Sequence, residues 1–403
     1  MRFKHCSIIL ILILFGCLPL YSQPVQIDNY SFLNLKADSI VYFGKSKTQF
    51  QSFVNKFSQM VRLGDRQINI LHIGDSHLQA DLYTGQVRKN FQSFMSGLSG
   101  SRGMITPFLK SSPDSYKLKF SSSWHSMNIV KSSDSKNLSL WGTTAYTTAL
   151  NNTIEVNVNY KNPIKYDFNR LRIYHSDLGT NDNISLTDIE IAYQKIYNKE
   201  EGYTEFILAS YTSEVTIVVT KQDNSTFYLY GLYFDNDDPG VVYNVSGTNG
   251  ASALSYLKID NLQNNIRSLN FDMVIISLGI NDTYEPGGEN TFENNLSSLV
   301  TKIQSAIDDQ TPILLITPVE CWWHKKKINP RQEKTIEIIQ QVAKQKGCLY
   351  LDMYTVLGGK GSSQKLFSNH LMQSDKVHFT AKGYQMQGDL LYNALWNEIE
   401  KNF

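Results

Sequence analysis

The stretch Ile68-Asn-Ile-Leu-His-Ile-Gly-Asp-Ser-His77 decides the fold and directs the search for a function. The apolar run over residues 68–73 predicts a buried strand, and Gly74 allows the backbone to turn sharply after it. Apolar residues at near-helical spacing from 78 to about 95 predict a helix next. Ser76 is therefore expected at or just before a helix N-terminus, where free N–H groups and the helix dipole stabilise an anion. A serine there can hold an acyl-transfer oxyanion with its own N–H, although an ordinary strand-to-helix turn has the same pattern.

The overall composition is that of a globular protein with room for two or perhaps three domains. The chain has 403 residues, of which 41% are hydrophobic and 19% are charged. Its 38 basic and 37 acidic residues give a formal net charge of +1. Such a balanced chain has no global field to attract it to nucleic acid or to an acidic membrane surface. We therefore predict no nucleic-acid partner.

The N-terminus has the pattern of a secretory signal peptide. Basic residues precede the apolar run over residues 8–15, and Leu20-Tyr-Ser22 is a plausible cleavage site, so residues 1–22 are predicted to be removed on export. Alternatively, Leu14-Phe-Gly-Cys17 is a lipoprotein box, and Cys17 carries a lipid. Because no second apolar run approaches the ~20 residues that span a bilayer, we expect no spanning segment in the mature chain. The predicted location is periplasmic or extracellular.

Alternating helix and strand patterns predict an α/β fold. An amphipathic helix over residues 46–61 precedes the first strand, and alternation resumes at Gly240. Four further strands are predicted at residues 241–245, 272–277, 312–316 and 349–352, separated by helices and followed by a last helix from about 381 to 399. This order predicts a five-stranded parallel sheet flanked by helices, flavodoxin-like, with sites at the C-terminal ends of the strands.

A segment of different composition and periodicity interrupts this pattern. Residues 99–238 are rich in Ser, Asn, Thr and Tyr, with period-two runs such as 154–160 and 215–219 between turn clusters. The pattern predicts an inserted antiparallel β-sandwich. The α/β domain is then expected in two parts, residues 23–98 and 239–403.

Two cysteines, Cys321 and Cys348, remain outside the predicted signal peptide. Cys321 follows one predicted strand and Cys348 precedes another, so a parallel sheet places them at opposite ends. Because a disulfide requires Cα atoms within ~7 Å, we expect two buried thiols.

Three more loops at the same predicted sheet edge carry groups that complete a site around Ser76. Gly247 follows the second strand in Ser246-Gly-Thr-Asn-Gly250, where it can present a backbone N–H to an oxyanion. Asn281 follows the third strand and offers a side-chain donor of the kind an oxyanion hole uses. A glycine-rich turn and a helix cap are the alternative interpretations.

The fourth loop contains Asp375-Lys-Val-His378. A separation of three residues allows the Asp375 carboxylate to accept from Nδ1–H of His378, leaving Nε2 free to take a proton from Ser76. A surface salt pair is the alternative interpretation. The other histidines considered, namely His72, His77, His324 and His370, are interpreted as core, loop or rim groups.

Together, Gly74-Asp-Ser-His77, the Gly247 loop, Gly279-Ile-Asn-Asp282 and Asp375-Lys-Val-His378 resemble the four sequence blocks of the SGNH, or GDSL-type, hydrolase family. The resemblance implies an esterase with Ser76 as nucleophile, His378 as general base and Asp375 as its orienting partner. It also implies an oxyanion hole formed by the N–H of Ser76, Gly247 and Asn281. No metal or other cofactor is expected.

A narrower resemblance suggests the substrate class. Gly74-Asp-Ser-His-Leu-Gln-Ala80, followed by Tyr83-Thr-Gly85 and Arg88, is similar to bacterial O-acetylpeptidoglycan esterases. Some of these also have a carbohydrate-binding-like β-sandwich inserted after the first block. Trp124 and Trp141 in the insert are candidates for stacking on sugars, but aromatic residues of β-sandwiches more often belong to the core.

The leading hypothesis is a secreted serine esterase that removes O-acetyl groups from a glycan, with peptidoglycan as the favoured substrate, through an acetyl-enzyme intermediate. A lipase or thioesterase on longer acyl chains is the alternative enzyme. A glycan-binding protein with an inactive hydrolase scaffold is the alternative outside enzymes, and acetyl transfer to a sugar uses the same residues. Because the general base must be neutral and a free histidine titrates near ~6.5, we expect mildly alkaline activity.

Overall fold

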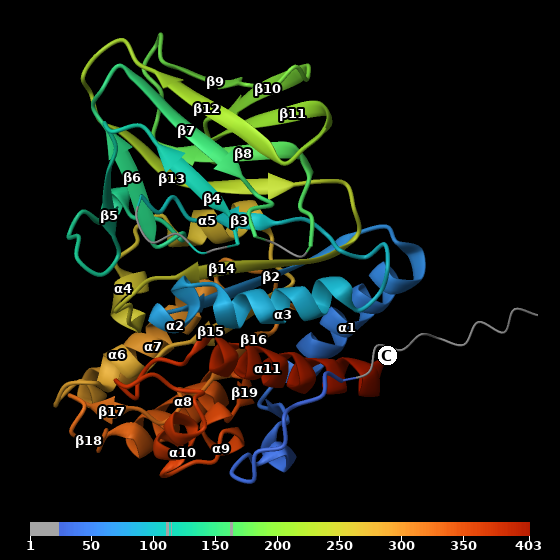
Figure 1. The fold of residues 1–403 in the computed structure, drawn as a ribbon, viewed down its shortest axis with the longest axis vertical. Coiled ribbons are helices and arrows are strands. Elements are labelled where there is room, and N and C mark those ends of the chain that lie inside the picture. The colour runs from blue at the N-terminus through green and yellow to red at the C-terminus, as the bar shows by residue number, and fades with distance from the viewer. Residues whose placement is uncertain (1–23, 110–112, 114, 162–163) are drawn as a thin grey trace, which may run out of the picture.

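A six-stranded sheet forms the centre of the α/β part of the molecule (Figure 1). The computed structural model describes residues 24–109, 113, 115–161 and 164–403. The strand order is β1-β19-β16-β15-β2-β14. The bounds are β1 Val41–Tyr42, β2 Gln67–Gly74, β14 Gly240–Gly247, β15 Met273–Ser277, β16 Ile313–Ile316 and β19 Leu349–Leu351.

The sheet is mixed, which corrects the prediction of a wholly parallel sheet of five strands. The strands from β19 to β14 run parallel, whereas β1 pairs antiparallel with β19 at the edge, Val41 facing Tyr350. With only two residues, β1 is too short to produce a periodic pattern of its own.

Helices cover both faces of this sheet because successive strand residues point to opposite sides. Ile70 belongs to the core beneath α1 (Ser46–Leu63), α3 (Leu82–Ser93) and α11 (Ala381–Asn402), whereas Leu71 belongs to the core on the other face. The helices of that second face are α4 Ala253–Leu257, α5 Leu262–Leu269, α7 Glu289–Gln304 and α8 Gln332–Lys346. The shorter elements are α2 Ser76–Gln79, α6 Ile280–Thr283, α9 Met353–Val356, α10 Ser362–Ser368, η1 Leu35–Ala37, η2 Ser135–Asn137, β17 Trp322–Trp323 and β18 Lys327–Ile328.

The predicted continuous helix after β2 is divided into α2 and α3. The break lies at Asp81, whose φ of 54° is in the left-handed region that ends a right-handed helix. The helical segment expected between the second and third predicted strands is likewise divided into α4 and α5. Both differences arise because helical spacing of apolar residues continues across a short turn.

The chain segment between α3 and β14 forms two antiparallel sheets, which lie at the top of Figure 1. The larger has the order β10-β11-β8-β13-β6-β5, with β3 also paired to β13, and the smaller has the order β4-β7-β12-β9. The bounds are β3 Gly103–Ile105, β4 Lys117–Phe120, β5 His125–Asn128, β6 Thr143–Thr147, β7 Asn151–Asn157, β8 Phe168–His175, β9 Asn183–Thr187, β10 Tyr193–Asn198, β11 Tyr203–Thr212, β12 Glu214–Thr220 and β13 Phe227–Asp235. Both sheets contribute to one hydrophobic core, as Ile217 and Phe206 illustrate.

This β-rich region is joined to the α/β part by a continuous apolar core. Trp141 and Tyr174, on the opposite side of the larger sheet, belong to the same cluster as Leu71 and Val274 of the central sheet. Burial of such large side chains contributes about 2 kcal/mol or more each. The two parts are therefore expected to keep a fixed relative position.

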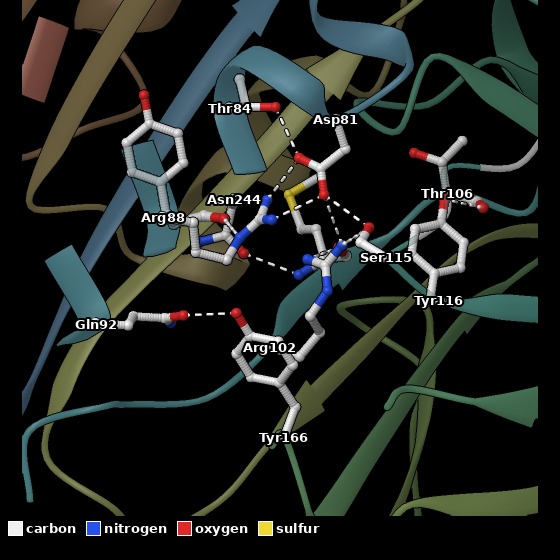
Figure 2. A network of polar contacts seen from close by, with 12 residues as sticks. Asp81, Thr84, Arg88, Gln92, Arg102, Thr106, Ser115, Tyr116, Tyr166 and Asn244 are labelled. Carbon is white, nitrogen blue, oxygen red and sulfur yellow. Dashed lines mark hydrogen bonds and ion pairs between the residues drawn. The ribbon is translucent and has the colours of Figure 1, made fainter. Parts of the chain in front are cut away.

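A buried ionic network reinforces the same junction (Figure 2). Asp81 accepts from Arg88 (Oδ2 to Nη1, 2.7 Å) and from Arg102 (Oδ2 to Nη2, 3.3 Å). Arg88 also donates to the carbonyl of Tyr243 in β14 (3.0 Å). Although burial acts in the opposite direction, the two guanidinium groups lower the pKa of Asp81 to about 2. The turn after α2 is thus tied to the first residues of the β-rich region.

The two cysteines are free and buried, which confirms the prediction of two thiols. The described helices include none that is both long and apolar enough to cross a membrane. The predicted signal peptide and Cys17 lie outside the described residues.

Candidate active site

Strand register brings three of the predicted loops to one edge of the central sheet. Gly74 at the end of β2 pairs with Gly247 at the end of β14 and with Ser277 at the end of β15. The segments that follow therefore start side by side. They carry Ser76, the residues after Gly247, and Asn281.

Ser76 is the first residue of α2, as its position after a strand and a glycine predicts. Asp75 caps this helix, because its Oδ1 accepts from the backbone N–H of His77 at 3.0 Å. Glycine is required at position 74, where a Cβ would lie 2.5 Å from Cδ1 of Leu78 and 2.9 Å from the carbonyl oxygen of Ser277. This close packing holds the half-buried Ser76 at the sheet edge.

The structure brings Ser76, His378 and Asp375 into one chain of contacts. Ser76 Oγ lies 3.0 Å from His378 Nε2, although 302 residues separate them. His378 Nδ1 lies 2.8 Å from Asp375 Oδ2. With a hydrogen on Nδ1, Nε2 is an acceptor for the hydroxyl proton of Ser76.

Asp375 is held in place by its own turn. Its Oδ1 accepts from the backbone N–H groups of Val377 (2.9 Å) and His378 (3.0 Å). Burial alone would raise its pKa, but these bonds and the contact with the imidazole lower the pKa below its ordinary value. Asp375 is therefore ionised at neutral pH, which favours a hydrogen on Nδ1 of His378.

Gly247 lies against α2 so closely that no larger residue fits. A Cβ at this position would be 2.6 Å from Cβ of Leu78 and 2.9 Å from the backbone nitrogen of Gln79. These atoms belong to the short helix that begins at Ser76. The end of β14 therefore supports the position of the serine.

Asn281 is close to Ser76 in the fold, but its side chain has other partners than the expected oxyanion. The residue lies in α6, and its Nδ2 donates to Asp75 Oδ2 (3.3 Å) and to the carbonyl oxygen of Ala251 (3.0 Å). Burial raises the pKa of Asp75 to about 6, despite the opposing hydrogen bond from His77 and the charge of His378. Both amide hydrogens of Asn281 are thus engaged.

His77 is buried, which agrees with its interpretation as a core, loop or rim group, and it also contacts the candidate base. Its ring stacks on that of His378, with centroids 5.3 Å apart and an interplanar angle of 28°. Its Nδ1 lies 3.1 Å from the hydroxyl of Tyr384. Burial, and then the charge of His378, lower the pKa of His77 to about 3. Its adjacency to Ser76 was the only sequence signal for this role.

Among the residues described, no group of three or more His, Cys, Asp or Glu side chains is arranged to hold a metal ion.

His72 is a histidine of the core. Its ring nitrogens contact the hydroxyls of Tyr243 (2.8 Å) and Ser277 (2.7 Å), and burial lowers its pKa to about 3.

Residues 210–386 match the model of the GDSL-like Lipase/Acylhydrolase family. The matched segment includes the Gly247, Asn281 and Asp375–His378 loops but not Ser76, which precedes the β-rich region. None of the curated proteins matches the chain.

Among solved structures, the chain is similar to one described as "Peptidoglycan O-acetylesterase in action, 5 min". The identity is 18%, the TM-score is 0.73, and the match covers 90% of this chain and 99% of the other. A lipase/acylhydrolase from Enterococcus faecalis matches with 21% identity and a TM-score of 0.32, covering 40% of this chain and 77% of its own. At this identity, the first match shows a shared fold.

Proposed function

We propose that this chain, which contains a GDSL-like acylhydrolase domain, is a serine esterase that removes O-acetyl groups from a glycan, with peptidoglycan as the favoured substrate. The observation that carries the proposal is the contact chain from Ser76 Oγ through His378 to Asp375. A serine, a histidine and a carboxylate in this order form the arrangement that activates a hydroxyl for attack on an ester.

In the first step, Ser76 Oγ attacks the acetyl carbonyl carbon while His378 Nε2 accepts the hydroxyl proton. The tetrahedral intermediate carries a negative oxygen, which we assign to the N–H groups of Ser76 and Gly247 and to Nδ2 of Asn281. For this role, one amide hydrogen of Asn281 turns away from Asp75 or Ala251. The contact with Asp75 is the longer of the two and hence the weaker.

Collapse of the intermediate breaks the bond to the sugar oxygen, and His378 donates its proton to that leaving group. The acetyl-enzyme is then attacked by water, which His378 deprotonates in turn. The ionised Asp375 stabilises the imidazolium in both steps and holds the ring in position. The products are acetate and a free sugar hydroxyl, and Ser76 is regenerated.

Two observations support a glycan as the substrate. The fold match to the peptidoglycan O-acetylesterase structure extends over 90% of this chain and therefore includes the β-rich region as well as the α/β part. The N-terminal sequence has the pattern of an export signal, which would bring the enzyme to the cell wall. We accordingly place the mature protein in the periplasm or outside the cell, and assign the β-rich region as an inserted, carbohydrate-binding-like domain.

The proposal is tested by acetate release from O-acetylated peptidoglycan and from acetylated xylan, with the mature protein and its Ser76→Ala variant. Loss of a nucleophile of this type costs on the order of 10⁶ in rate. Release from peptidoglycan that requires Ser76 supports the proposal, whereas release from xylan alone assigns the enzyme to another polysaccharide. No release from either substrate, together with tight glycan binding, would instead indicate an inactive scaffold.

Nitrophenyl esters of increasing chain length separate acetyl esterase from lipase or thioesterase activity. We expect the highest kcat/KM with acetate. A rise beyond butyrate would contradict the acetyl preference and favour the enzyme for longer acyl chains.

A further inference from the structure

A cavity of about 460 Å³ lies at the junction between the β-rich region and the loops that carry the candidate site. Its volume is within the range of small-molecule binding sites. The residues that line it and matter for the argument are Gln79, Phe108, Trp124, His125, Lys131 and Asn249.

The floor of the cavity is continuous with the segments around Ser76. Gln79 is the last residue of α2, one helical turn after Ser76, and Asn249 follows Gly247 by two residues. The two floor residues are joined, because Gln79 Oε1 accepts from the backbone N–H of Asn249 at 2.6 Å. A ligand in the cavity would therefore contact the last residue of the short helix that begins at Ser76.

The wall of the cavity belongs to the β-rich region. His125 and Ser126 are exposed residues of β5, and Trp124 precedes them. Trp124 is kept in place by edge-to-face contacts with Phe120 (5.6 Å) and Phe227 (6.1 Å). Trp124 itself is buried in the core of the β-rich region, so the exposed His125 and Ser126 are the groups that this wall offers to a sugar for hydrogen bonding.

The lining of the cavity includes the ammonium group of Lys131 but no carboxylate. Lys131 is exposed, and within the described part of the chain it forms no ion pair. A lysine ammonium that forms no ion pair is available to an anionic ligand.

We propose that this cavity binds the sugar units next to the acetylated one, and that Lys131 pairs with a carboxylate carried by that glycan chain. The inference rests on the proposed function, because a polymer whose ester reaches Ser76 must pass over the neighbouring surface. The β-rich region would then contribute directly to substrate choice, and acidic glycans would be preferred to neutral ones.

Three substrates and three variants test this assignment in the full mature chain. The substrates are nitrophenyl acetate, O-acetylated peptidoglycan as the acidic glycan, and chemically acetylated chitohexaose as the neutral glycan. Lys131→Ala removes the cation, and Ser126→Trp fills the cavity from an exposed strand position. Lys136→Ala is the matched control, because Lys136 is an exposed lysine of the same segment that does not line the cavity.

We expect Lys131→Ala to lower kcat/KM on peptidoglycan about 5-fold, as for an exposed ion pair, and to leave the neutral glycan and the small ester unchanged. Ser126→Trp should lower kcat/KM about 10-fold or more on both glycans and leave nitrophenyl acetate unchanged. Lys136→Ala should resemble the wild type on all three substrates.

The assignment is overturned if Lys131→Ala and Ser126→Trp leave glycan turnover unchanged, or if they reduce it no more than they reduce nitrophenyl acetate hydrolysis. Failure of the proposed function looks different, because the wild type would then release acetate from neither glycan. Equal effects of Lys131→Ala on both glycans would reject the carboxylate contact.

Discussion

The imidazole of His77 stacks on that of His378, with ring centroids 5.3 Å apart. The hydroxyl of Tyr384 holds Nδ1 of His77, and the ring of Phe379 meets His77 edge-on at 6.3 Å. Because burial and the charge of His378 lower the pKa of His77 to about 3, this ring is neutral wherever the enzyme is expected to act. A neutral His77 ring does not repel a positive charge on His378, and the stacking contact restricts the orientation of the His378 ring.

We therefore predict that His77→Ala lowers kcat about 10- to 100-fold on nitrophenyl acetate with little change in KM, since small misplacements of a base are costly. His77→Phe, which keeps an aromatic plane, should recover part of the loss. His370→Ala, at an exposed histidine outside the site and the cavity, is the control. Steady-state kinetics check the result, and an unchanged kcat in His77→Ala would contradict the role.

Asp375→Asn is expected to lower kcat by about 10⁴. The amide carries no negative charge to stabilise a protonated His378, and it favours the wrong tautomer of that ring. The carboxylate is partly exposed, so the thermal midpoint should change little. Initial rates beside thermal unfolding of the same preparation give the measurement. A loss of activity that follows a loss of folded protein would count against the assignment.

Gly247→Ala should displace α2, because the added Cβ would meet Leu78 and the backbone nitrogen of Gln79 at 2.6 and 2.9 Å. We expect kcat to fall about 100-fold as Ser76 moves away from His378. Gly85→Ala is a matched control, since its nearest contact, to Asp81 at 3.7 Å, is ordinary packing within α3. The control should keep full activity and gain up to about 1 kcal/mol of stability.

In the buried network between the α/β part and the β-rich region, removal of the carboxylate and removal of a guanidinium should change the free energy of unfolding by different amounts. Asp81→Asn leaves Arg88 and Arg102 buried without a counter-charge and should cost about 3–5 kcal/mol in the free energy of unfolding. Arg102→Met keeps the pair of Asp81 with Arg88 and relieves repulsion between the arginines, because burial and then Arg88 lower the pKa of Arg102. Its cost should be smaller, about 0–2 kcal/mol. Urea denaturation of both variants decides the order, and equal costs would contradict it.

The pH dependence of stability follows from two opposing sets of buried groups. Burial raises the pKa of three carboxyl groups above the ordinary value of 3.8, to about 7 for Asp38, about 6 for Asp75 and about 7 for Asp282. Because the native state then binds more protons than the unfolded state, these groups make the protein less stable as the pH rises from about 4 to 7. Burial lowers the pKa of three histidines below the ordinary value of 6.5, to about 3 for His72, about 3 for His77 and about 4 for His175. Because the unfolded state then binds more protons than the native state, these histidines make the protein less stable as the pH decreases.

These contributions offset each other between about pH 4.5 and 6.5, so the thermal midpoint should be nearly constant there. Below pH 4 the raised carboxyls no longer contribute, while the histidines and Asp81, with its pKa of about 2, still favour the unfolded state. A steep loss of stability is expected on that side. Asp75→Asn should raise the midpoint at pH 8 but not at pH 4, and calorimetry across this range checks both expectations.

Much of the fold was predictable because its signals are local. The apolar runs of β2 and β15 and the spacing of apolar residues in α1 and α11 are visible within a few residues of sequence. The candidate site was accessible for the same reason. Ser76, Gly247 and Asn281 each follow a recognisable strand, and parallel strands place such positions at one edge of a sheet.

Other features depend on residues far apart in the sequence and only the tertiary structure decided them. The helix breaks at Asp81 where Arg102, 21 residues later, supplies a second buried charge. His77 became part of the site because α11 brings Tyr384 and the preceding loop brings His378 against it. The sequence alone thus determined the α/β elements and the residue types of the site. Packing determined which neighbours those residues have, because a contact between distant segments leaves no periodicity in either one.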